Sequence, residues 1–310
     1  MSIEQVILKI KSHPYMLKMG AGKLSKMFNC TRDDVYEAKK VVKEGITYKR
    51  LPKILLLDIE IAPNKAAIFR VWKQNVGPDQ LLSEWFMLTW SAKWLFDDEV
   101  LSDRLTPSEA KDEDDKRILL SIWELLDEAD IVIAHNAKYF DIPRINTRFL
   151  IENIQQPSTY RMIDTLFEVK KQFDFLYNRL DYINNRLGLG RKLEHGGMKD
   201  LWIPATNGSE KALLEMEEYN KVDVEILEEL YLRIRPWIKS HPNMGLYMES
   251  KEPVCANCGS PDVKPDGKSY YTYTGKYQTY RCSCGALSRV RKSDLDKEVG
   301  SNLLVSLPSR

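Results

Sequence analysis

Asp58 and Glu60 are two carboxylates whose types and spacing could do chemistry. They end residues 54–60, ILLLDIE, whose unbroken apolar start is typical of a strand buried on both faces of a sheet. Side chains on a strand alternate between its faces, so residues two apart point the same way. Two neighbouring carboxylates repel each other unless a divalent cation lies between them. The pair therefore indicates a metal-dependent hydrolase, and an exposed turn after an ordinary strand is the alternative.

Two further carboxylates stand where they could join this pair. Asp141 follows a short apolar strand and comes just before Pro143, which suits the first turn of a helix. Such a strand-to-helix connection delivers a side chain to the C-terminal edge of a sheet, where α/β proteins bind ligands. Tyr219 and Asp223 are four residues apart in a predicted helix and so share one face.

The C-terminal cysteines have the spacing of metal ligands. Cys255 and Cys258 form one pair, Cys282 and Cys284 form a second, and glycine follows each pair. Four thiolates are a common ligand set of structural zinc, so we expect one Zn²⁺ in a zinc ribbon. The second pair encloses one residue, whereas a ribbon usually has two there.

Five tyrosines lie between the two cysteine pairs, together with lysine and arginine. Such residues could stack on bases and meet phosphates of single-stranded DNA. The alternative is that zinc only stabilises a core too small to fold without it. The tyrosines are Tyr270, Tyr271, Tyr273, Tyr277 and Tyr280.

A sheet with helices around it must position these groups. The pattern predicts an α/β fold in which helices flank a sheet. Predicted strands are 54–60, 66–72, 86–96, 131–134 and 161–165; predicted helices are 118–126, 141–150 and 210–235; and 97–115, which is acidic and contains proline, is predicted to be a loop.

The chain is expected to have three parts, at 1–50, 51–248 and 249–310. The first is a small basic helical module in which two helices flank a turn at 29–31, with Thr31 as N-cap of the second. This resembles a helix-turn-helix. Asp33 and Asp34 stand where a recognition helix would approach DNA, so a packing module is the alternative.

Charge is unevenly spread along the 310 residues, whose net charge is +1. Residues 1–53 hold 12 basic and 5 acidic side chains, residues 54–248 hold 24 and 33, and residues 249–310 hold 10 and 7. Basic ends around an acidic middle suit a protein that grips a polyanion and holds metals at its centre. Plain solvated surface would give the same counts.

The sequence also carries signals about its compartment. No apolar run is long enough to span a membrane, and the N-terminus lacks the apolar core of a signal peptide. Four of the five cysteines have metal-ligand spacing rather than that of a disulfide framework. We therefore expect a cytoplasmic protein without membrane contact, with a phage or prokaryotic origin left open.

Taken in order, the motifs resemble those of the DEDD exonuclease superfamily. This resemblance implies an RNase H-like fold, with a mixed five-stranded sheet flanked by helices. The matching motifs are DIE at 58–60, Asn136 through Phe140-Asp141, and Tyr219-x-x-x-Asp223. Tyr219 is typical of the DEDDy branch, because the DEDDh branch has histidine where Glu218 stands. IDT at 163–165 is also similar to the 3′–5′ exonuclease domain of family B DNA polymerases. The resemblance covers roughly residues 52–240, so a stand-alone exonuclease is expected.

This resemblance implies two Mg²⁺ or Mn²⁺ ions and a role for each matching residue. Asp58 would bridge both ions, Glu60 and Asp223 would complete one site, and Asp141 would hold the second. Tyr219 would orient the attacking water, and Asn136 and Phe140 would position substrate. Asp164 would support the site.

The expected function is metal-dependent 3′–5′ hydrolysis of DNA, at single-stranded 3′ ends, to nucleoside 5′-monophosphates. Such an enzyme would serve proofreading or end processing, with a polymerase or other replication protein as partner. The motifs do not separate this from an RNA-directed exonuclease of the same fold. A nucleic-acid-binding replication or regulatory protein with a vestigial nuclease site is the alternative from another class.

Overall fold

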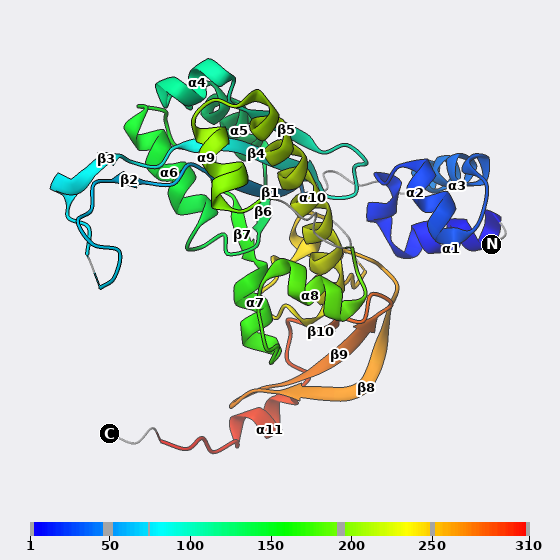
Figure 1. Ribbon diagram of the computed structural model, residues 1–310. Coiled ribbons are helices and arrows are strands. Elements are labelled where there is room, and N and C mark those ends of the chain that lie inside the picture. The colour runs from blue at the N-terminus through cyan, green and yellow to red at the C-terminus, as the bar shows by residue number, and fades with distance from the viewer. Residues whose placement is uncertain (1–2, 46–51, 74, 191–195, 249–251, 308–310) are drawn as a thin grey trace. The chain divides into compact units, whose positions relative to one another are not determined.

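The computed structural model describes residues 3–45, 52–73, 75–190, 196–248 and 252–307 (Figure 1). The chain divides into two compact units. Residues 52–234 form a central unit, and residues up to 51 and from 235 onward form a terminal unit. The three-part organisation expected from the sequence stays a prediction. None of the described helices is both long enough and apolar enough to cross a membrane.

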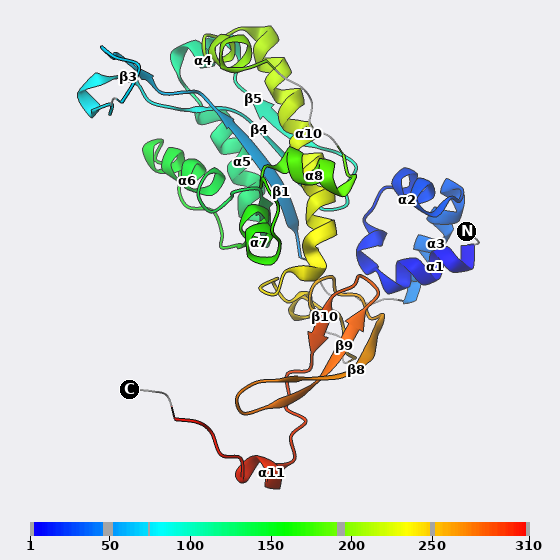
Figure 2. The same ribbon diagram turned by 60° about the horizontal axis from the view of Figure 1, so that its bottom comes forward.

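The central unit is built on a mixed sheet, as predicted. Within the described residues the sheet has five strands in the order β5-β4-β1-β6-β7. β1 runs parallel to β6 and antiparallel to β4, so it lies in the middle (Figure 2). The strands are β1 (Ile54–Ile61), β4 (Met87–Trp94), β5 (Leu101–Arg104), β6 (Ile131–Ala134) and β7 (Arg161–Asp164).

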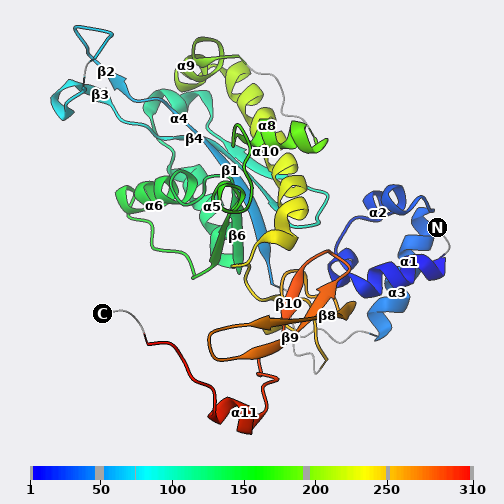
Figure 3. The same ribbon diagram turned by 90° about the horizontal axis from the view of Figure 1, so that it is seen from below.

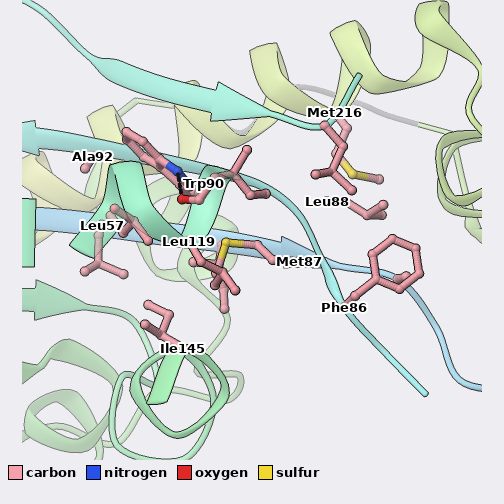
Figure 4. Close-up of a cluster of buried hydrophobic side chains, with 14 of the residues drawn as sticks. Leu57, Phe86, Met87, Leu88, Trp90, Ala92, Leu119, Ile145 and Met216 are labelled. Carbon is pink, nitrogen blue, oxygen red and sulfur yellow. Dashed lines mark hydrogen bonds between the residues drawn. The ribbon is translucent and has the colours of Figure 1, made fainter. Parts of the chain in front are cut away.

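The two faces of β1 have different neighbours. Leu55, Leu57 and Ile59 are buried in a core with Leu119 and Ile145 (Figure 4). Figures 2 and 3 show the helices that carry the last two, α5 (Lys116–Glu128) and α6 (Asp141–Ile151), on one side of the sheet and α10 (Glu210–Ile234) on the other. Side chains alternate along a strand, so Asp58 and Glu60 face α10.

A buried ion pair fixes α10 against the sheet. Glu228 on α10 pairs with Lys93 on β4, and both side chains are almost fully buried. The other carboxylate oxygen of Glu228 accepts a hydrogen bond from the backbone N–H of Phe96, at 2.9 Å. Substituting one partner of such a pair strongly destabilises the folded protein, because it leaves an uncompensated buried charge. The contact therefore fixes the register of the helix that carries Asp223.

The remaining elements of the central unit connect or cover this sheet. A small two-stranded sheet, β2 (Lys65–Ala66) and β3 (Leu81–Ser83), lies between β1 and β4 in the sequence. Further α-helices are α4 (Pro107–Asp112), α7 (Thr165–Gln172), α8 (Leu180–Leu187) and α9 (Ile203–Thr206).

Two predictions about connecting segments were wrong. Residues 66–72 do not form a strand beyond Ala66, because the apolar side chains that follow have no second layer to pack against and lie exposed. Residues 97–115 are not a loop throughout, since they contain β5 and α4. The start of α4 is a capping box in which Thr106 and Glu109 bond each other's backbone N–H, at 3.3 and 2.8 Å.

In the terminal unit, the described N-terminal residues are helical, as predicted. The helices are α1 (Ile3–Ser12), α2 (Ala21–Phe28) and α3 (Arg32–Gly45). Thr31 caps α3, because its Oγ1 accepts a hydrogen bond from the Asp34 N–H at 3.1 Å, and Asp34 accepts one from the Thr31 N–H at 3.0 Å. Asp34 thus has a capping role that the sequence prediction had not assigned.

The C-terminal part of the terminal unit contains a β-hairpin extended by a third strand. β8 (Val263–Tyr271) pairs antiparallel with β9 (Lys276–Cys282), and β10 (Leu287–Arg289) adds to β9, before a short helix α11 (Lys297–Ser301). Tyr15, from the N-terminal part, packs against the cysteine cluster that closes this hairpin.

Candidate active site

Three of the predicted carboxylates come together at the sheet. Asp58, Glu60 and Asp223 each offer an oxygen, and these oxygens all lie within 4.8 Å of one another. Asp58 and Glu60 come from the end of β1, and Asp223 comes from the face of α10 that packs on it. Hard cations bind carboxylate oxygens at about 2.0–2.6 Å, so groups this close can share one ion. The donor set therefore fits Mg²⁺ or Mn²⁺.

Asn220 is a site residue that sequence reasoning missed. Its Nδ2 donates a hydrogen bond to Asp58 Oδ2 at 2.6 Å, and its side chain is fully buried. Its position in the sequence could have identified it, because Asn220 precedes Asp223 by three residues and so shares its helix face. By holding one oxygen of Asp58, Asn220 leaves the other oriented for a metal.

Asn220→Ala is expected to weaken divalent-metal binding at the carboxylate group by about 10- to 100-fold, the usual effect of removing a hydrogen-bond partner of a ligand. A Mn²⁺ titration followed by calorimetry measures this. Glu225→Ala, on the exposed face of the same helix, is the control. Equal Mn²⁺ affinity in the wild type and Asn220→Ala would show that Asp58 needs no such support.

Tyr219 faces the same three carboxylates. Burial is the main cause that raises the pKa of its phenol, and the charges of Asp223, Glu60 and Asp58 raise it further. The ring of Trp202 lies edge-on to the Tyr219 ring, with centroids 6.2 Å apart. Tyr219 therefore keeps its proton and can act as a hydrogen-bond donor beside the metal site.

Asp141 lies outside this group of three and is the most deeply buried of the four predicted carboxylates. Its side chain is 1% exposed. Among the described residues, neither of its oxygens finds a hydrogen-bond partner with ordinary geometry. Burial is the main cause that raises its pKa to about 7, with a further contribution from the charge of Asp164; the backbone N–H groups of Asp141 and Ile59 oppose the shift. A buried carboxylate whose oxygens lack a hydrogen bond of ordinary geometry fits a cation ligand.

Metal-free protein is expected to lose stability as the pH rises, because of Asp141. Its pKa is higher in the folded chain, about 7, than the ordinary value of 3.8, so the folded state binds more protons between these values. The free energy of unfolding therefore falls across this window. Asparagine mimics the protonated acid, so Asp141→Asn should stabilise the protein more at about pH 8 than at about pH 5, by at least about 1.4 kcal/mol.

Urea unfolding at the two pH values, in EDTA, measures this difference. Asp112→Asn, at an exposed position in α4, is the control. An Asp141→Asn effect that is the same at both pH values would mean that Asp141 titrates normally.

The segment that leads into Asp141 is held by Asp164. Asp164 accepts backbone hydrogen bonds from Asn136 at 3.1 Å and Lys138 at 3.0 Å, and from Phe167 at 3.1 Å in the first turn of α7. Asn136 has a φ of 80°, a left-handed conformation that asparagine tolerates better than most residues. Asp164 thus supports the approach to the site, while substrate contact by Asn136 and Phe140 stays a prediction.

The four cysteines of the terminal unit also form a group. Cys255 Sγ lies 3.8 Å from Cys284 Sγ, and Cys258 Sγ lies 3.6 Å from Cys282 Sγ. Tetrahedral zinc with bonds of about 2.3 Å needs sulfurs about 3.8 Å apart, so the donor set fits Zn²⁺.

Glycines allow the tight turns around these cysteines. Gly259 and Gly285 follow the two pairs and have φ values of 74° and 93°. Gly285 N–H donates to Cys282 O at 2.9 Å, which closes the turn of the second pair although it encloses one residue. The shorter spacing is thus compatible with four converging sulfurs.

Comparisons with known proteins found two similarities to parts of this chain. Residues 94–235 match a family model described as the RNase_H superfamily. A solved structure that is similar to the chain is the family B DNA polymerase from the hyperthermophilic archaeon Pyrobaculum calidifontis. The TM-score is 0.45 and the identity 16%, over 62% of this chain and 26% of that one, so the chain spans about a quarter of the polymerase's length. No curated protein matches the chain. Residues 94–235 thus resemble the RNase_H superfamily, and the α/β fold of the central unit is RNase H-like.

Proposed function

We propose that this protein is a metal-dependent 3′–5′ exonuclease that acts on single-stranded DNA ends and releases nucleoside 5′-monophosphates. The observation that carries the proposal is the group of Asp58, Glu60 and Asp223, with Tyr219 beside it, on an RNase H-like sheet. The order of the DEDDy-type motifs along the chain supports the same reaction. Oxygen ligands without thiols suit the hard cations that such hydrolysis uses.

In the proposed mechanism, this chain's residues hold the metal ions and orient the attacking water. Asp58, Glu60 and Asp223 would bind one divalent ion, and Asp141, with Asp58, would bind the other. The bound ions would supply an activated water and stabilise the leaving 3′ oxygen. Tyr219 keeps its proton because burial and three carboxylates raise its pKa. Its hydroxyl can therefore fix the orientation of a water beside Asp223.

The terminal unit is proposed to contribute to DNA binding. Tyr271 and Tyr273 are exposed on the β8–β9 hairpin, where they could stack on bases. Arg289 lies over the ring of Tyr277, at 4.1 Å, and over that of Tyr270, at 5.6 Å. A role in proofreading or end processing, beside a polymerase or other replication protein, would follow from such an activity.

The experiment that tests the function uses single-stranded DNA labelled at its 5′ end, with Mg²⁺, Mn²⁺ or EDTA. We expect a ladder that shortens from the 3′ end with either metal and no cleavage in EDTA. Parallel reactions with RNA decide the substrate class, since both polymers offer the same phosphodiester to the carboxylates. DNA that stays intact with both metals would overturn the proposal for DNA, and RNA cleavage in the same series would reassign the site.

A further inference from the structure

Residues 65–73 and 75–83 belong to an arm that the proposed mechanism does not use. β2 and β3 pair at its root, with Lys65 opposite Ser83 and Ala66 opposite Leu81. The arm begins at Lys65, four residues after Ile61, where the strand that carries Asp58 and Glu60 ends. In Figures 1, 2 and 3 it projects beyond the large sheet of the central unit.

The outer part of the arm exposes large apolar side chains beside cations. Phe69 is 99% exposed, Trp72 84% and Val71 82%. Arg70 and Lys73 alternate with them, and no acidic residue occurs between 67 and 77 in the sequence. Clustered exposed aromatic groups mark binding surfaces rather than ordinary surface. The positive charge favours a negatively charged occupant.

The root of the arm is fastened to the rest of the central unit. Glu113 Oε1 accepts hydrogen bonds from Lys65 Nζ at 2.8 Å and Ser83 Oγ at 3.0 Å, one from each strand of the arm. Just beyond β3, the Trp85 N–H donates to Asn64 Oδ1 at 2.9 Å. The root of the arm is therefore fixed to the rest of the central unit by hydrogen bonds.

Trp85 also begins a stack that leads from the arm root toward Asp141. The Arg144 guanidinium lies 4.8 Å from the centroid of the Trp85 ring and 4.5 Å from that of Phe140, so two aromatic rings hold it. Within the described residues, the Arg144 side chain makes no hydrogen bond or ion pair, and its Nε is buried without a partner. A guanidinium carries five N–H donors suited to phosphate. Arg144 is three residues after Asp141 on α6 and shares its face.

We propose that the arm and Arg144 together hold a single strand of nucleic acid that leads to the candidate metal site. Phe69 and Trp72 stack on bases, Arg70 and Lys73 lie along the backbone, and Arg144 binds a phosphate next to Asp141. Alternating aromatic and cationic groups are the usual means of binding single strands without regard to sequence. The inference rests on the proposed function for its direction, toward the carboxylates.

Binding of a fluorescent single-stranded DNA of about 16 nucleotides tests this, by anisotropy in EDTA so that no hydrolysis occurs. The double variant Phe69→Ala/Trp72→Ala should weaken binding by about 10-fold or more, since each stacked base contributes substantially. Leu150→Ala/Leu176→Ala, which removes two exposed leucines outside the arm, is the matched control and should bind as wild type does.

Salt dependence separates the two parts of the proposal. Arg144→Gln should weaken binding and lower the slope of log Kd against log salt by about 1, as expected for one lost phosphate contact. The double arm variant should keep the wild-type slope, because it removes no charge. Circular dichroism melting checks that all variants are folded.

Two results would overturn the proposal. The first is wild-type binding by both the arm variant and Arg144→Gln. The second is wild-type DNA binding by the arm variant, together with sedimentation that shows a dimer for the wild-type protein and a monomer for the arm variant. That result would make the arm a contact between copies of this chain. Weaker binding by the variants of a protein that does not cleave DNA with Mg²⁺ would instead support the arm and reject the exonuclease.

Discussion

Asp58→Asn is expected to lower the rate of DNA hydrolysis by about 1000-fold or more, which corresponds to about 4 kcal/mol of lost transition-state stabilisation. Asp58 lies with Glu60 and Asp223 in a group whose oxygens are within 4.8 Å of one another, and Asn220 holds its Oδ2. Asparagine keeps the shape and one oxygen but removes the negative charge that a shared cation needs. The loss should therefore appear in the rate and in metal binding rather than in folding.

Rates of 3′-end shortening in Mg²⁺ measure this effect, and Asp112→Asn at an exposed position is the control. DNA binding in EDTA separates chemistry from affinity. Removing a negative charge near the phosphates should leave binding unchanged or tighten it. Asp58→Asn that cleaves at the wild-type rate would mean that the group of carboxylates has no part in hydrolysis.

The sequence predicted the sheet because its signals were local. The apolar run before Asp58 and the short apolar strand at 131–134 each have the length and pattern of a buried strand. The same reasoning failed at 66–72, where apolar residues form an exposed arm, because local pattern does not tell what covers a side chain. It also missed β5, an edge strand whose polar residues hide its pairing with β4.

The site was predicted less completely than the fold. Spacing within one strand predicted that Asp58 lies beside Glu60, and spacing within one helix predicted that Tyr219 lies beside Asp223. Contacts in the folded chain show that these two pairs meet. It also shows that Asp141 lies outside the group of three. Asn220 and Arg144 belong to no metal-ligand or catalytic pattern, because their roles depend on which side chain or ring lies opposite. Their importance is therefore visible from contacts and not from residue type.

Removing the zinc that the four cysteines are proposed to bind is expected to unfold the β8–β9–β10 ribbon. Structural zinc contributes about 10–16 kcal/mol to small domains of this kind. Within the described residues, the buried cluster of the ribbon consists of Cys255, Cys258, Cys282 and Ala286, which is too little apolar surface to replace the metal. Cys258→Ser should reduce bound zinc from one equivalent to less than half and make the ribbon sensitive to protease, while the central unit keeps its own core of strands and helices.

Metal analysis by atomic emission and limited proteolysis measure these two effects, and Cys30→Ser is the matched control because Cys30 lies outside the four-sulfur group. Zinc content and protease resistance equal to wild type in Cys258→Ser would show that the four sulfurs do not bind the metal that holds the ribbon. The same variant also tests what the ribbon does. If its exposed tyrosines grip DNA, its loss should weaken binding of long single strands while the central unit still cleaves, because the carboxylates lie on a separately packed core.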